Sequence, residues 1–296
     1  MKTITGLSAF PITPVDEAGV VDTETLQRLL ARLVAAGVDS IGLLGSTGSY
    51  AYLTRAERLR AIEAAVECVA GRVPLLVGIG ALRTDEASEL ARDALRADVQ
   101  MGLLAPVSYV PLQEHEVFEH FQAVSEVGLP LCIYNNPGTT HFSFTPELVG
   151  RLAELPNIVA VKNPAPGVGE IGDLHADLLA RVPSDFSLGY SVDWHAGQAL
   201  LAGGDAWYSA LAGLYPDIAL RLTRAAQGGR TEEVAQLNRQ LEPVWRLFRA
   251  YSSYRVMHLA ASREGFGEAQ PIRPVLPLAD EAARDVETVL ERSGLT

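Results

Sequence analysis

The chain has 296 residues, 48% hydrophobic and 20% charged, with a formal net charge of −12. This composition is typical of a soluble globular protein, and the length fits either two average domains or one α/β barrel. Because no cluster of basic residues offsets the negative charge, we expect neither nucleic acid nor an anionic membrane surface as a partner.

Neither the N-terminus nor the two cysteines suggests secretion. The first residues lack the long apolar core of a signal peptide, and no apolar run approaches the length of a membrane-spanning helix. Cys68 and Cys132 lie within apolar runs, which favours small buried side chains over a disulfide or a metal site. We therefore expect a cytoplasmic protein.

Short apolar runs alternate along the chain with segments whose apolar residues recur at helical spacing. Strands are expected at residues 8–14, 40–45, 74–80, 99–106, 129–134, 158–162, 186–190 and 205–211. Helices are expected at residues 26–36, 55–69, 114–127, 169–181, 194–201, 231–248, 256–261 and 281–290; another, after Thr84, carries apolar residues from 87 to 95, and one more opens at Pro146.

Helix-terminal residues support several of these boundaries. Gly37 is placed to end the first helix, and Thr54 and Glu57 have the spacing of a capping box. Thr84 is predicted to cap the third helix. Thr145 precedes a proline at the first helical position of another helix.

Eight alternations of strand and helix without a long linker favour a closed parallel (β/α)8 barrel, the TIM barrel, with a C-terminal helical extension. A doubly wound open sheet is the alternative, but no Gly-x-Gly-x-x-Gly turn follows the first strand. We predict a barrel domain over residues 1–228 and helices packed on its flank over residues 229–296.

Lys162 is an unusual residue in this chain. Of 24 basic residues only Lys2 and Lys162 are lysines, which leaves 22 arginines. Lys162 follows the apolar run Ile158 to Val161, which predicts a strand buried on both faces with the amine at its end. A desolvated lysine can lose its proton and become a nucleophile. The two interpretations are a lysine paired with a carboxylate and a Schiff-base lysine.

Other polar groups follow predicted strands at the edge where barrel enzymes bind ligands. Tyr134 ends the fifth strand and can reach Lys162 from the neighbouring strand, where its phenol can transfer protons. The turn Gly45 to Gly48 offers hydroxyl groups and backbone N–H groups to a carboxylate or phosphate. Ser191 follows the seventh strand, and nearby Asp193 has helix capping as its alternative role.

The six histidines show no metal-binding spacing, so neither a metal nor another cofactor is predicted. His141 lies in the loop after Tyr134, where it either faces the mouth of the barrel or solvent.

Together these motifs resemble the pyruvate-dependent class I aldolase and lyase family that includes dihydrodipicolinate synthase and N-acetylneuraminate lyase. The matching residues are the turn 45–48, the Tyr-Asn-x-Pro run 134–137, Lys162, the run 10–14 and the Gly-Gly-Asp run 203–205. The resemblance extends over the whole chain.

The resemblance implies a role for each matching residue. Lys162 would form an imine with the C2 carbonyl of a 2-oxo acid, and Tyr134 and Ser46 would be the other catalytic residues. Gly45, Ser46 and Thr47 would bind the carboxylate. Thr139, Tyr109, Ser191 and Tyr208 complete the expected substrate-binding set. No cofactor is needed, and family members are usually homotetramers built from dimers.

Three departures from the family pattern concern the second substrate. Thr139 occupies the place of an arginine that grips the carboxylate of that substrate in the synthases. Ser49 replaces a glutamate. Ser108 aligns with a tyrosine contributed across the subunit interface, and Tyr109 beside it is a candidate replacement.

We therefore predict a Schiff-base lyase, an aldolase or dehydratase acting on pyruvate, a 2-oxo-3-deoxy acid or a hydroxy-oxo acid. One alternative is 4-hydroxy-tetrahydrodipicolinate synthase activity, which condenses pyruvate with aspartate semialdehyde. A non-catalytic 2-oxo acid binding barrel and a metal-dependent barrel aldolase are the alternatives from other classes.

Overall fold

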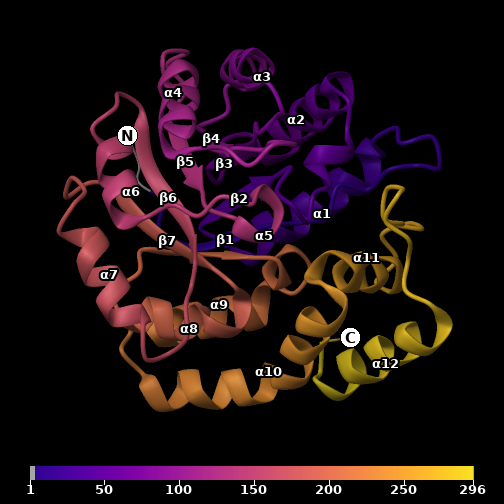
Figure 1. Cartoon of the computed structure of the whole chain (residues 1–296). Coiled ribbons are helices and arrows are strands. Elements are labelled where there is room, and N and C mark those ends of the chain that lie inside the picture. Colours follow the sequence, from indigo (N-terminus) through magenta and orange to yellow (C-terminus); the bar gives the residue numbers. More distant parts are fainter. Residues whose placement is uncertain (1–3, 296) are drawn as a thin grey trace.

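Eight short strands pair in parallel from β1 round to β8, and β8 pairs with β1, so the sheet closes into a barrel (Figure 1). This computed structural model describes residues 4–295. The strands are β1 (Gly6–Ala9), β2 (Ser40–Leu43), β3 (Leu75–Gly78), β4 (Met101–Leu104), β5 (Leu131–Tyr134), β6 (Ile158–Pro164), β7 (Ser187–Ser191) and β8 (Ala206–Ser209). The predicted (β/α)8 barrel with C-terminal helices is confirmed.

Helices surround the barrel and continue beyond it. They are α1 (Thr23–Ala36), α2 (Arg55–Val69), α3 (Thr84–Arg96), α4 (Glu114–Ser125), α5 (Pro137–Thr140), α6 (Pro146–Ala153), α7 (Ile171–Leu179), α8 (Asp193–Leu201), α9 (Pro216–Gln227), α10 (Thr231–Tyr251), α11 (Ser253–Arg263) and α12 (Asp280–Arg292), with 3₁₀ turns η1 (Tyr50–Tyr52) and η2 (Leu211–Gly213). Helices α5 and α9 have no counterpart among the predicted elements. The buried face of α9 is partly alanine.

Most helix ends follow the predicted chemistry. Gly37 ends α1 with a left-handed φ of 80°, and Thr145 accepts a hydrogen bond from the N–H of Leu148. Thr54 accepts from the N–H of Glu57 at 3.2 Å. The Glu57 carboxylate, however, accepts from the N–H of Val21 at 2.6 Å, so it links α2 to the segment before α1.

The predicted cap at Thr84 is wrong. Arg83 is the N-cap residue of α3, with extended backbone and no side-chain capping bond, and Thr84 is the first helical residue. The hydroxyl of Thr84 lies 2.9 Å from Nδ1 of His120 on α4. It therefore joins two neighbouring helices and does not cap its own.

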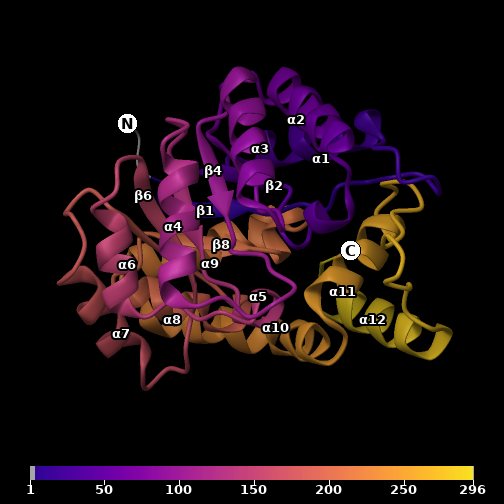
Figure 2. The same ribbon diagram turned by 45° about the horizontal axis from the view of Figure 1, so that its top comes forward.

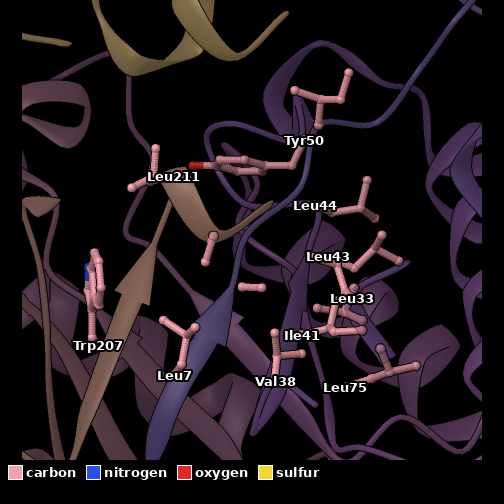
Figure 3. Packing of buried hydrophobic residues seen from close by; sticks show 14 of the residues in the cluster. Leu7, Leu33, Val38, Ile41, Leu43, Leu44, Tyr50, Leu75, Trp207 and Leu211 are labelled. Atoms are coloured by element: carbon pink, nitrogen blue, oxygen red, sulfur yellow. The ribbon is translucent and has the colours of Figure 1, made fainter. Parts of the chain in front are cut away.

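Strand side chains alternate between the barrel interior and the layer beneath the helices. Leu7, Ile41 and Trp207 pack in that outer layer, around β1, β2 and β8 (Figure 3). The inward positions form a second cluster, which comprises Ile4, Phe10, Leu76, Met101, Leu103, Ala105, Cys132, Tyr134, Ala160, Ala206 and Tyr208. Lys162 lies two residues beyond Ala160 on β6 and shares its inward face.

The C-terminal helices lie along one side of the barrel (Figures 1 and 2). Helix α10 packs against α8 and α9, and α12 packs against α10 and α11. The division into domains at residue 228 stays a prediction. Among residues 4–295, no helix is both long and apolar enough to cross a membrane.

Candidate active site

Strand β6 carries Lys162 into the barrel, opposite Tyr134 on β5 and Gly189 on β7. The strand is largely buried, as predicted, but it continues two residues past the lysine, because Asn163 and Pro164 still pair with β7. Lys162 is 5% exposed. The amine is thus held on rigid, regular backbone near the carboxyl ends of the strands.

Aromatic rings surround the Lys162 amine. Nζ lies 3.8 Å from the ring centroid of Phe10, 4.3 Å from that of Tyr134 and 5.8 Å from that of Tyr208. Within residues 4–295 no salt bridge involves this lysine, whereas a purely structural buried lysine needs a carboxylate partner. The geometry therefore favours the Schiff-base interpretation over the ion-paired one.

Glycines make room for two of these rings. A Cβ added to Gly42 would lie 2.1 Å from Phe10, and one added to Gly189 would lie 2.3 Å from Tyr208. Neither distance is possible for packed atoms. The small residues on β2 and β7 therefore let the rings approach Lys162. Phe10, which the predicted site omits, is part of its surroundings.

We expect Gly42→Ala to lower the free energy of unfolding by about 1–3 kcal/mol, because the new methyl group overpacks the barrel against Phe10. Gly172→Ala is the matched control, since a Cβ there meets nothing within 4 Å and the residue lies in α7. Urea denaturation of both variants measures the difference. Equal stabilities would show that Phe10 is not confined by Gly42.

Tyr134, Ser46 and Asn136 form a hydrogen-bonded triangle beside the lysine. The hydroxyl oxygens of Ser46 and Tyr134 are 3.0 Å apart, and Asn136 Nδ2 donates to Ser46 at 3.3 Å and to Tyr134 at 3.1 Å. Since Asn136 donates to both oxygens, one hydroxyl remains free to donate to the other. Asn136 is absent from the predicted site. It lies within the Tyr-Asn-x-Pro run, but at the variable position of that run.

The turn after β2 presents unused backbone donors. The N–H groups of Ser49 and Tyr50 bond to the carbonyls of Ser46 and Gly45 and so close the turn. Among the described hydrogen bonds, none uses the N–H of Ser46 or of Thr47. Adjacent free N–H groups next to a buried amine are suited to a carboxylate.

The other predicted substrate-binding residues range from buried beside the lysine to fully exposed. Tyr208 is 2% exposed and its hydroxyl lies 3.6 Å from Cys132 Sγ, where burial raises the pKa of the phenol well above its usual value. Ser191 is half-buried and donates to the Asn163 carbonyl at 3.3 Å. Thr139 is exposed, and Tyr109 is 94% exposed.

The exposure of His141 agrees with one of its two interpretations, whereas Asp193 does not have its expected capping role. His141 is exposed at the end of α5. Asp193 does not cap α8, whose N-cap is Val192. Its carboxylate is buried and accepts from Trp207 Nε1 at 2.9 Å and from the N–H of Ala210 at 3.3 Å, which joins α8 to β8.

Asp193 is expected to make stability depend on pH. Burial raises its pKa from 3.8 to about 6, despite opposing hydrogen bonds from Ser209, Trp207 and Ala210 and the positive charge of Lys162. The folded chain therefore binds this proton more tightly than the unfolded chain, so the contribution to stability falls as pH rises from about 4 to about 6. In the wild type this lowers the free energy of unfolding by about 2–3 kcal/mol between pH 4 and pH 6, and Asp193→Asn should abolish that decrease.

Urea denaturation at several pH values between 4 and 7 measures this effect, and the exposed Asp173 supplies the control variant Asp173→Asn. If the difference in stability between wild type and Asp193→Asn is independent of pH, the carboxyl group does not titrate as the buried geometry requires.

No group of three or more His, Cys, Asp or Glu side chains within residues 4–295 is arranged to hold a metal ion. That no cofactor is needed stays a prediction.

A parallel (β/α)8 barrel with a buried lysine, a tyrosine and free N–H donors at its carboxyl edge has the layout of a class I, Schiff-base-forming lyase. The comparison with known proteins agrees. The chain belongs to the dihydrodipicolinate synthetase family, whose model matches residues 3–293. Members of this family are pyruvate-dependent class I aldolase-type enzymes. The predicted family and enzyme class are confirmed.

Relatives match along nearly the whole chain. The 4-hydroxy-tetrahydrodipicolinate synthases of Aromatoleum aromaticum and Azoarcus sp. (strain BH72) are 32% and 33% identical over 297 residues, 99% of each chain. The crystal structure of dihydrodipicolinate synthase from Agrobacterium tumefaciens str. C58 has a TM-score of 0.95 and 52% identity, and the match covers 99% of this chain and 98% of that one.

Proposed function

We propose that Lys162 forms a Schiff base with the keto carbon of a 2-oxo acid, and that the enzyme is an aldolase or dehydratase. The observation that carries the proposal is the amine itself, which is buried within the barrel, enclosed by Phe10 and Tyr134, and in no salt bridge among the described residues, although its charge acts on the buried Asp193. Such an amine is held ready to attack a carbonyl group once it is neutral.

Tyr134 serves as the proton carrier in this proposal. When the neutral Nζ bonds to the keto carbon, one amine proton passes to the carbonyl oxygen and gives a carbinolamine. A second proton, taken up from solvent, then reaches the hydroxyl group, which leaves as water and yields the iminium ion. The Tyr134 hydroxyl, bonded to Ser46 and Asn136, transfers protons in both steps. The iminium then accepts the electron pair when a proton or a carbon–carbon bond at C3 is lost, and an enamine forms.

Ser46 and Thr47 bind the carboxylate in this proposal. Their backbone N–H groups are free, and the Ser46 hydroxyl lies within 3.0 Å of the Tyr134 hydroxyl. A carboxylate held there would place the adjacent keto carbon beside the amine. This fixed placement lowers the barrier by pre-orienting the two reacting groups.

The structure constrains the rest of the substrate, beyond its 2-oxo acid group, less closely. Thr139 and Tyr109 are both exposed, so they can contact a substrate chain only at the rim or in an assembled oligomer. We propose a 2-oxo-3-deoxy or hydroxy-oxo acid as substrate, without a cofactor, for a cytoplasmic homo-oligomer, a dimer or tetramer. The names of the relatives favour one alternative, condensation of pyruvate with aspartate semialdehyde.

A substrate screen tests the proposal. Purified enzyme is incubated with a panel of 2-oxo-3-deoxy acids and, separately, with pyruvate plus aspartate semialdehyde. Release of pyruvate or of a dehydrated 2-oxo acid supports the lyase. Efficient condensation identifies the synthase. If pyruvate binds reversibly but there is no turnover and no trapped imine, the protein is a non-catalytic binding barrel.

A further inference from the structure

Helix α11 contacts the turn that we assign to carboxylate binding, although more than 200 residues separate them. The hydroxyl oxygens of Ser49, at the end of that turn, and Tyr254, in the first turn of α11, are 2.9 Å apart. Tyr254 also accepts from the N–H of Ile272 at 3.2 Å. Since the Ile272 bond uses a lone pair of the phenol, its proton is free for Ser49.

His258 lies one helical turn after Tyr254, and its ring packs against the ring of Tyr254. The two rings are 4.5 Å apart between centroids, and His258 is 1% exposed. Its Nδ1 lies 2.7 Å from the carbonyl oxygen of Ala269, which fixes Nδ1 as the protonated nitrogen. Burial lowers the pKa of His258 to about 4, and the backbone carbonyls of Ala269 and Thr47 oppose this only in part. The ring is therefore a neutral, rigid support at ordinary pH.

The turn needs such support because its backbone is unusual at both ends. Leu44 and Ser49 have φ values of 54° and 60°, in the left-handed region that disfavours side chains larger than glycine. The carbonyl oxygen of Leu44 packs directly against Gly78 of β3, where an added Cβ would lie only 1.8 Å from it. This close contact holds Leu44 in place. Ser49 is 1% exposed, and the only side-chain hydrogen bond described for it is the one to Tyr254.

We propose that Tyr254 is a positioning residue for the carboxylate-binding turn, so that the C-terminal extension sets the affinity of the barrel for 2-oxo acids. This inference rests on the proposed role of Ser46 and Thr47. Through Ser49, the phenol holds the turn in the shape that points both N–H groups at the substrate. Tyr254 itself touches neither the lysine nor its ring neighbours among the described contacts.

The test measures how much pyruvate is needed for half-maximal imine trapping by borohydride. Tyr254→Phe keeps the ring and removes only the hydroxyl, so the half-saturating concentration should rise about fivefold, the change expected from losing one hydrogen bond. The maximal yield of adduct should not change, because Lys162 is untouched. Ser49→Ala should give the same shift, and the double variant no more than either single one.

Acetone separates positioning from general damage, because it is a ketone without a carboxylate. Its trapping should be the same in wild type and in Tyr254→Phe. Tyr251→Phe is the matched control, since that hydroxyl contacts Asp285 in the tail and not the turn.

An unchanged pyruvate dependence in Tyr254→Phe, or an equal shift for acetone, would overturn the positioning role while leaving the proposed function intact. If the wild type gave no adduct at all, the proposed function would fail first and this inference with it.

Discussion

Replacing Lys162 by methionine should abolish turnover, by about four orders of magnitude or more, because the side chain that forms the covalent intermediate is gone. Methionine keeps the length of the apolar stem and fits among the rings of Phe10 and Tyr134, so the barrel should stay folded. The assay follows the substrate identified in the screen, and thermal unfolding confirms that the variant is native.

The chain provides an unusually clean control, because its only other lysine is Lys2. Lys2→Met should retain full activity. Lys162→Arg should be as inactive as Lys162→Met, since a guanidinium keeps the charge but cannot act as a nucleophile. Appreciable activity in either Lys162 variant would mean that the lysine serves charge or packing and not chemistry.

Tyr134→Phe should lower kcat by about two to three orders of magnitude, the usual contribution of a positioned proton carrier. Its ring still packs against Lys162, but the hydroxyl that bonds to Ser46 and Asn136 is lost. The imine with pyruvate should still form on long incubation, because the amine remains. Single-turnover kinetics with borohydride quenching separates slow formation from failure to form.

Tyr190→Phe is the matched control, because it too removes a buried strand hydroxyl, one that bonds to His175 outside the site. Its kcat should stay close to that of the wild type. An equal loss in both tyrosine variants would point to disturbance of the barrel and would contradict a proton-transfer role for Tyr134.

The sequence predicts the barrel well because its strands are apolar runs buried on both faces, and because several helices have end signals such as Gly37 and Thr145. Lys162 and Tyr134 lie side by side because neighbouring strands of one sheet set their distance, and the register pairs them directly. The turn 45–48 follows from the same reasoning, since it comes after a strand that ends at the same edge.

Contacts that depend on three-dimensional packing could not be predicted. Nothing in the local sequence says that Phe10 lies over the lysine, which follows from the space that Gly42 leaves. Asp193 has the position of a helix cap, and only the neighbouring β8 shows that it bonds to Trp207. The bond between Ser49 and Tyr254 joins residues too far apart in sequence for any periodic pattern to indicate.

The central claim is that Lys162 forms the imine, and one measurement tests it most directly. Enzyme is incubated with pyruvate and borohydride, digested, and mapped by mass spectrometry. Our account predicts one reduced pyruvyl group per chain, on the peptide that contains Lys162, and no adduct in Lys162→Met. An adduct on another residue, or none in the wild type under conditions of full activity, would contradict it.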